Sequence, residues 1–304
     1  MTALWILCSS FCSASIIACI QYLGETLGFL DIAFVEFIFV LAVTSVVMLV
    51  RGIPFRTELW PLHLLRSVIG VGVVVTQIIT ATHMPVAATQ TLQYTSPLFV
   101  ACFVSIAALK NNENLDWRVL ASIAAAFSGI CVMFHPSART FSSVYVSVGL
   151  LCGFLTALSI LLLKKLGSRD EPVSRTIFYF HLHGTALLGV AEFFCGNLQA
   201  SALQQPPLAL LLILLVFSHY ARTHGWGKGN TLLASVLSFS GVVFATLIDR
   251  VVFQEIPGVR TMAGMCIIVV AAAVCLILVA GNEKRKTLGR VVFEQSSDGN
   301  RHKN

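Results

Sequence analysis

Long apolar runs recur along almost the whole chain, and they decide what it can fold into. A helix needs about 20 mainly apolar residues to cross a bilayer. Charged residues make up only 11% of the chain, against roughly 25% in soluble domains. This excludes a water-soluble globule, and we predict an all-α integral membrane protein with ten transmembrane helices. The predicted spans are 3–20, 32–50, 65–83, 87–109, 118–134, 144–163, 176–195, 207–221, 230–252 and 260–280.

The distribution of Lys and Arg between the predicted loops sets the orientation. With both termini in the cytoplasm, 17 basic residues lie on the inner side, and only Arg139, Arg250 and Arg260 lie outside. Such an excess of basic residues is typical of cytoplasmic loops. We therefore expect a multi-pass protein of the cytoplasmic (inner) membrane. The net charge of +6 fits this topology, and no long basic block indicates nucleic acid.

The spacing of short breaks and polar helices indicates an internal repeat. The stretch from Thr82 to Glu113 is followed 141 to 142 residues later by a similar stretch from Thr223 to Glu255. Five spans is an odd number, so the second copy would enter the membrane inverted, as in many transporters. We expect a first repeat at 1–143, a second at 144–281, and a basic, polar cytoplasmic tail at 282–304 that is disordered.

Two stretches carry a resemblance to a known family. The sequence from His83 to Phe99, with Thr95-Ser96-Pro97, and the later Gln254-Glu255-Ile256-Pro257 resemble the EamA-type transporters of the drug/metabolite transporter superfamily. The resemblance covers nearly all of residues 3–281 and looks closest to the bacterial branch with S-adenosylmethionine uptake and riboflavin transporters. It implies a transporter scaffold without naming the cargo. Arg66 fits the family's usual basic residue at the start of the third span, whereas Glu36 stands where relatives commonly have Arg.

Polar side chains concentrate in the third, fourth and ninth spans. Amide groups are costly in hydrocarbon unless they are paired, so they should face the bundle interior or a wet cavity. Two interpretations stay open: hydrogen bonding between helices, which is common in membranes, or a wall that binds a polar substrate. Pro97 is expected to kink the fourth span. The candidate substrate-binding residues are Gln77, Thr80, Gln90, Gln93, Tyr94, Ser235 and Ser238.

Ionisable residues inside the spans are few, and each is a functional candidate. Glu36 could bind a cationic group of the substrate or carry a coupling proton; the alternative is a carboxylate at the membrane interface. Asp249 and Arg250 suggest an ion pair on the outer surface. His181 and His183 are two residues apart and point to different helix faces, so they lack the spacing of a helical metal site.

No catalytic or cofactor motif is present in the sequence. It contains no HExxH, GxSxG, Walker A or GxGxxG pattern, and its nine cysteines form no CxxC. We therefore expect no enzyme activity, no metal and no cofactor. The leading hypothesis is a secondary transporter of a small polar metabolite that works by alternating access. The alternative is an intramembrane enzyme acting on a lipid-linked substrate, which would require Glu36, Asp249 and a His to converge. The partners in view are the metabolite, membrane lipid, a proton or substrate gradient, and a second copy of the chain in a homodimer, with no nucleic acid.

Overall fold

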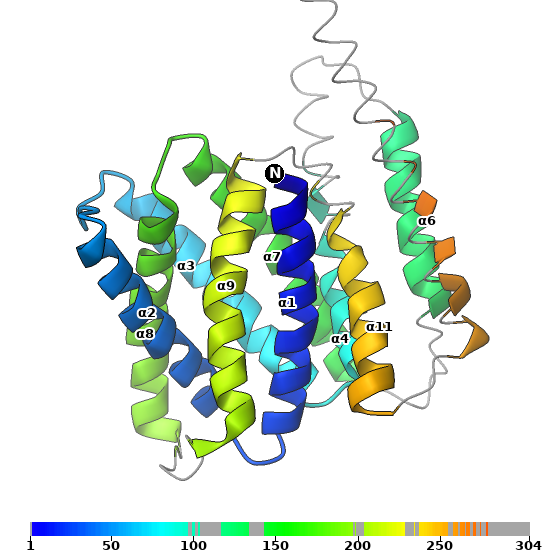
Figure 1. The fold of residues 1–304 in the computed structure, drawn as a ribbon, viewed down its shortest axis with the longest axis horizontal. Helices are drawn as coiled ribbons and strands as arrows, with labels where there is room; N and C mark the ends of the chain where they lie inside the picture. The colour runs from blue at the N-terminus through cyan, green and yellow to red at the C-terminus, as the bar shows by residue number, and fades with distance from the viewer. Residues whose placement is uncertain are drawn as a thin grey trace, which may run out of the picture.

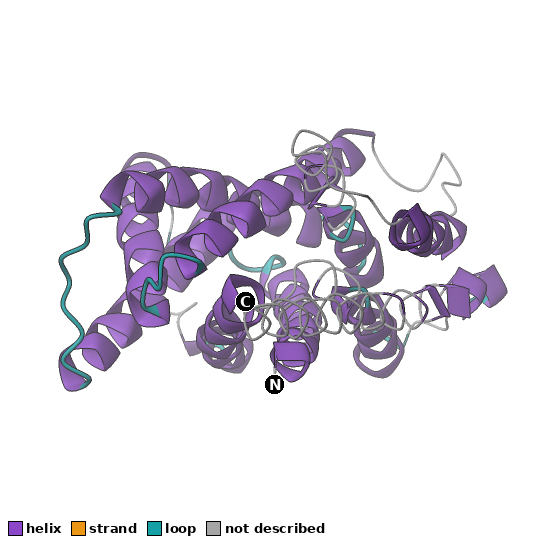
Figure 2. Ribbon diagram, turned by 90° about the horizontal axis from the view of Figure 1, so that it is seen from above, coloured by secondary structure: helices purple, strands orange, loops and turns teal. Residues whose placement is uncertain are grey.

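Helices are the only regular elements among the residues that the structure describes (Figures 1 and 2). The structure is a computed structural model. It describes residues 2–96, 99–100, 103, 117–133, 143–196, 198, 204–228, 234, 237–254, 258–260, 262–264, 266–267, 270–271, 274 and 278. The helices are α1 (Thr2–Leu23), α2 (Phe29–Val50), α3 (Trp60–Ala81), α4 (Val86–Gln93), α6 (Trp117–Met133), α7 (Ser143–Gly167), α8 (Val173–Cys195), α9 (Pro206–Lys228) and α11 (Ser240–Val252).

Six of these helices are long and apolar enough to cross a membrane: α1, α2, α3, α7, α8 and α9. They correspond to the predicted first, second, third, sixth, seventh and eighth spans, so a multi-pass membrane protein is confirmed. Helix α6 corresponds to the fifth span. The fourth, ninth and tenth predicted spans run into residues outside the described part, as does the tail at 282–304, so the total of ten stays a prediction.

Prolines and one glycine mark several helix ends. Pro61 lies in the first turn of α3, Pro172 precedes α8, and Pro206 begins α9. Proline is tolerated there because the first helical amides have no partner within the helix. Gly52 follows α2 with φ of +62°, a backbone conformation that glycine adopts without a steric penalty. These short connections return the chain directly into the next helix.

The fourth span is interrupted just before Pro97, the residue expected to kink it. Helix α4 ends at Gln93, a turn covers Tyr94 and Thr95, and helix resumes at Ser96. Pro97 itself lies outside the described residues. A proline at this position cannot donate to the carbonyl of Gln93 and disfavours the helical conformation before it. The break therefore falls on the N-terminal side of the proline.

A second break lies close to the first. Phe239 sits in a turn between helical Ser238 and α11, and its ring centroid is 6.2 Å from that of Tyr94. A Cβ on Gly241 would collide with the Tyr94 hydroxyl, so glycine permits this approach. Two interrupted helices therefore meet inside the bundle.

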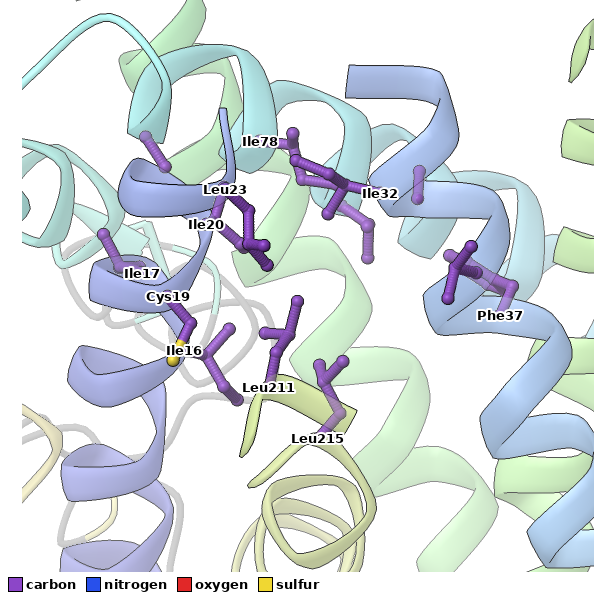
Figure 3. Packing of buried hydrophobic residues seen from close by; sticks show 14 of the residues in the cluster. Ile16, Ile17, Cys19, Ile20, Leu23, Ile32, Phe37, Ile78, Leu211 and Leu215 are labelled. Carbon is purple, nitrogen blue, oxygen red and sulfur yellow. The ribbon is translucent and has the colours of Figure 1, made fainter. Parts of the chain in front are cut away.

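The apolar core joins helices from both ends of the sequence. In Figure 1, α1 lies between α9 and α11, and α2 lies beside α8, in agreement with the main helix contacts. Figure 3 shows Ile20, Ile32, Ile78 and Leu211 from four different helices directed into one interior. Gly184 of α8 faces the Phe37 ring, and a Cβ there would overlap it. Small residues of this kind let membrane helices approach closely, which fixes the helices around the site.

Candidate functional site

A polar cavity of about 90 Å³ lies within the bundle. Its lining comes from α1, α2, α3 and the fourth span, and also from α7, α8, α9 and Ser238, so residues before and after position 144 both contribute. The polar and charged side chains of its wall are those of Ser9, Ser10, Ser13, Glu36, Arg66, Gln77, Gln93, Tyr94, Ser96, Thr156, Ser159, Ser218, His219, Arg222, Thr223 and Ser238. Apolar helices thus surround a polar interior.

Two glutamines of neighbouring helices form one part of the wall. Gln93 Nε2 donates to Gln77 Oε1 over 3.1 Å, and both side chains are buried. Gln93 Oε1 is shielded from solvent and has no partner among the described residues. A buried amide oxygen without a partner is costly, so the Gln77–Gln93 pair presents an unused acceptor. Tyr94 follows in the helix break and also lines the cavity.

The other predicted binding residues have different positions. Ser238 lines the cavity. Thr80 does not, because its hydroxyl donates to the carbonyls of Thr76 and Gln77 in its own helix. Gln90 is fully buried beside the cavity and donates to the Ser13 hydroxyl over 3.4 Å. Ser235 lies outside the described residues. Four of the seven predicted residues therefore reach the cavity, namely Gln77, Gln93, Tyr94 and Ser238.

Glu36 lies on the cavity wall. It is the eighth residue of α2, about 10 Å from the start of the helix at 1.5 Å per residue, and it is only 3% exposed. His219 of α9 places Nε2 3.6 Å from Glu36 Oε1. The carboxylate therefore sits in the bundle interior, beside the His219 imidazole.

His181 completes a cluster with these two residues. The ligand atoms of Glu36, His181 and His219 all lie within 4.8 Å of one another. His181 Nδ1 donates to the Ile177 carbonyl over 2.8 Å, so in the neutral ring Nε2 carries a free lone pair. A hydrogen bond from the other ring nitrogen to a carbonyl is typical of a metal-ligating histidine. Sequence reasoning missed the cluster because its members come from α2, α8 and α9, and only a tertiary contact joins them.

Two arginines bring positive charge to the same cavity. Arg66 of α3 is 5% exposed, and its Cζ lies 4.5 Å from the centroid of the Phe180 ring. Arg222 of α9 is close enough to interact electrostatically with Glu36, Arg66 and His219. A metal ion at the three-residue cluster would meet this charge, which opposes cation binding. Only Arg66 had a sequence signal, through the family resemblance.

Asp249 has a structural role away from the cavity. Its Oδ2 accepts from the Ala87 amide over 2.9 Å, and the side chain is buried, whereas Arg250 is exposed. A carboxylate at a helix N-terminus is stabilised by the unpaired amides and the helix dipole. The expected outer-surface ion pair of Asp249 and Arg250 therefore gives way to a cap on α4, which fixes the helix that carries Gln93.

A second polar cluster, the inner latch, lies at the predicted cytoplasmic end and consists of Thr57, His63, Glu171 and Arg175. Arg175 Nε and Nη2 donate to the two Glu171 oxygens over 2.8 and 3.0 Å, and His63 and Thr57 also donate to Oε1. Arg175 Nη1 donates to two carbonyls of the α2–α3 loop. Burial raises the pKa of Glu171, but hydrogen bonds from Arg175, His63 and Thr57 lower it more, so the pKa lies below its ordinary value.

A bundle of apolar helices around a polar, charged cavity defines the class of multi-pass helical membrane proteins with an internal site. Residues 1–135 match the EamA-like transporter family, which confirms the resemblance seen in the sequence. The first 135 residues are thus similar to transporters of the drug/metabolite type.

Relatives of known name support this class over most of the chain. The pseudopaline exporter CntI from two strains of Pseudomonas aeruginosa is 24% identical over 264 residues, 86% of this chain and 91% of the exporter. A riboflavin transporter of Brucella anthropi is 22% identical over 274 residues, 87% of this chain and 94% of that protein. A protein crystal structure matches with a TM-score of 0.73 at 19% identity, covering 91% of this chain and 96% of the other; this likeness shows the fold.

Proposed function

We propose that the chain is a secondary transporter that carries a small polar metabolite across the cytoplasmic membrane by alternating access. The observation that carries the proposal is the polar cavity inside the apolar bundle. A polar interior in a membrane protein is costly and typical of a substrate path. The names of the relatives are those of transporters of small metabolites, which favours transport over catalysis.

The cavity wall supports binding of a polar cargo. Gln93 Oε1 is a shielded acceptor without a partner among the described residues. Donors on a cargo would satisfy it, while the Gln77 contact keeps the Gln93 side chain in place. A site that must hydrogen-bond its substrate rejects analogues that lack the matching group. We therefore assign Gln77, Gln93, Tyr94 and Ser238 to the binding wall.

The origin of the lining supports alternating access. Side chains from α1 to the fourth span face side chains from α7 to α9 across one cavity. In transporters built from inverted repeats, the site lies between the halves, and rocking of one half against the other exposes it to each side in turn. We propose that the predicted repeats, 1–143 and 144–281, are these moving halves.

Glu36 is the proposed coupling residue. Its buried carboxylate lines the cavity, where gain or loss of a proton would change the charge that the cargo meets. A proton gradient would then drive transport through the charge state of the cavity. The alternative of an intramembrane enzyme required Asp249 to lie beside Glu36 and a histidine. Asp249 instead caps α4, which does not favour the enzyme.

Flux measurements in proteoliposomes test the proposal. Purified protein is reconstituted and exposed to S-adenosylmethionine, riboflavin, amino acids and nucleosides, with and without an imposed proton gradient; protein-free liposomes are the control. We expect saturable flux of one class of compound that responds to the gradient. Folded protein that gives no saturable flux with any polar metabolite would contradict transport.

A further inference from the structure

Arg66 is a buried side chain with two guanidinium nitrogens that have no partner within the described part of the chain. Its side chain lines the cavity, and Nε and Nη1 are shielded from solvent with no hydrogen-bond partner among the described residues. A guanidinium has five N–H donors and stays protonated in proteins. The contact with the Phe180 ring covers the flat face of the group, and the N–H groups of Nε and Nη1 have no hydrogen-bond partner among the described residues.

Arg66 is not a side chain that reaches back to the membrane surface. It is the seventh residue of α3, about 9 Å along the helix. A snorkelling arginine buries its stem and keeps the charged end in water. Here the charged end is the shielded part, since Nε and Nη1 are buried from solvent. The guanidinium therefore points into the cavity.

The charges of the cavity do not balance. Arg66 and Arg222 both line it, and Glu36 is the one carboxylate among the described residues that do so. Arg222 interacts with Glu36 and with Arg66, so two guanidinium groups share the cavity with a single carboxylate. Glu36 also faces His219. With neutral histidines and an ionised Glu36, the described lining of the cavity carries a net positive charge of one, which an anion would neutralise.

We propose that Arg66 and Arg222 bind an anionic oxygen group of the cargo, a carboxylate or a phosphate. The inference rests on the proposed transport function and names the class of substrate for that same cavity. Arginine suits this role because its planar guanidinium can donate two parallel hydrogen bonds to a carboxylate or to a phosphate. Arg66 precedes residue 144 and Arg222 follows it, so one anion between them links the two halves of the chain.

A metal ion at Glu36, His181 and His219 is the competing occupant of this region. The ligand spacing allows it, but a divalent cation would add two charges beside two arginines. The anion reduces the local charge, whereas the cation increases it, and the interaction between unlike charges is strong in a shielded site. The geometry therefore favours the anion, and the experiment below includes zinc as a separate arm.

Arginine-selective labelling tests the proposal without knowledge of the natural cargo. The full chain in nanodiscs is treated with a dicarbonyl reagent, and mass spectrometry reads the modification of Arg66 and Arg222. The probes are succinate, inorganic phosphate, the uncharged succinamide and Zn²⁺. We expect succinate or phosphate to slow modification of both arginines at least tenfold and succinamide to have no effect; which anion protects distinguishes a carboxylate from a phosphate cargo. Absence of protection by either anion, or protection by Zn²⁺ alone, would overturn the proposal.

Variants separate a binding role from a structural one. Arg66→Gln should lose anion protection at Arg222 and raise the thermal stability of the empty protein, because a buried charge without a partner is removed. Arg66→Lys should keep the charge and show intermediate protection. The control Arg250→Gln, at an exposed position on α11, should change neither readout. A fall in the stability of Arg66→Gln with protection retained would make Arg66 a packing residue and overturn the inference.

Flux assays test the anion site and the transport function separately. Saturable flux of an uncharged metabolite that persists in Arg66→Gln would leave the transporter intact and overturn the anion site. Anion protection in a protein without any flux would support the anion site and contradict transport.

Discussion

The inner latch and the cavity both contain buried charged groups, but the two regions differ in how fully these groups are hydrogen-bonded. In the latch, both oxygens of Glu171 and all three nitrogens of Arg175 have hydrogen-bond partners. In the cavity, two nitrogens of Arg66 and the side-chain oxygen of Gln93 have no partner among the residues that the structure describes. Satisfied charges hold segments together, whereas unsatisfied ones are retained at a cost in stability that a ligand can remove.

This difference indicates that the latch stabilises the fold and that the cavity binds a ligand. The latch ties the α2–α3 loop to the start of α8 through Arg175 and through Tyr179, whose hydroxyl donates to the Phe55 carbonyl. It fixes one end of the helices whose other residues, such as Glu36 on α2, face the cavity. Changes in the latch should therefore alter stability first, and changes in the cavity should alter transport first.

The largest effect is expected from Glu171→Gln in the latch. The change removes one partner of a buried ion pair and leaves Arg175 without its counter-charge, which typically costs about 3 to 5 kcal/mol. Unfolding in detergent by heat or denaturant measures the loss. Asp170→Asn, at the exposed neighbouring position, is the matched control and should be near neutral. Equal stability of the two variants would mean that the latch does not hold the inner end together.

Gln93→Leu should have the next largest effect, and it should act on transport. Leucine keeps the apolar volume but removes the acceptor in the cavity and the donor to Gln77, a loss of about 2 kcal/mol, or roughly 30-fold in flux. Insertion and unfolding should change little. Gln205→Leu, at the bundle end where Gln205 pairs with Thr26, is the control. Normal uptake by well-folded Gln93→Leu protein would remove this residue from the site.

Most of the helical framework could be predicted from hydropathy, because apolar length alone identifies a membrane span. The contacts between helices could not be predicted in this way. The pairing of Gln77 with Gln93 and the cluster of Glu36, His181 and His219 join residues of different helices, whereas spacing rules group residues along one helix. The latch was missed for a related reason, since Glu171 stands in a short polar connection that reads as a turn.

The break of the fourth span shows a finer limit of sequence reasoning. Pro97 indicated that the helix is disturbed, but the rule for proline does not say how far the disturbance extends. In the structure, the turn at Tyr94 and Thr95 lies next to Phe239 of the ninth span. The packing of the two breaks, together with Gly241, therefore sets the position that proline alone leaves undefined.

Glu36→Gln should give a smaller and more specific effect in the cavity. If the carboxylate carries the coupling proton, the variant should lose the dependence of flux on an imposed proton gradient. A single titrating group can change the flux by at most about tenfold per pH unit, and this bounds the expected effect. Exchange of cargo without a gradient should persist. Gln keeps the size of the side chain and its contact distance to His219, so folding should be unaffected. An unchanged pH profile would assign proton coupling to another group.

The smallest effect is expected from acid acting on the latch. The pKa of Glu171 lies below its ordinary value near 4.5 because Arg175, His63 and Thr57 hydrogen-bond to the ionised form. A lowered pKa in the folded state means that the carboxylate stabilises the fold at any pH above that ordinary value, and that this stability is lost as pH falls through the lowered pKa. The stability difference between the wild type and Glu171→Gln should therefore stay constant near neutral pH and narrow in acid. A difference that widened in acid would show that Glu171 is held in its protonated form, and the contrast with the unsatisfied charges of the cavity would fail.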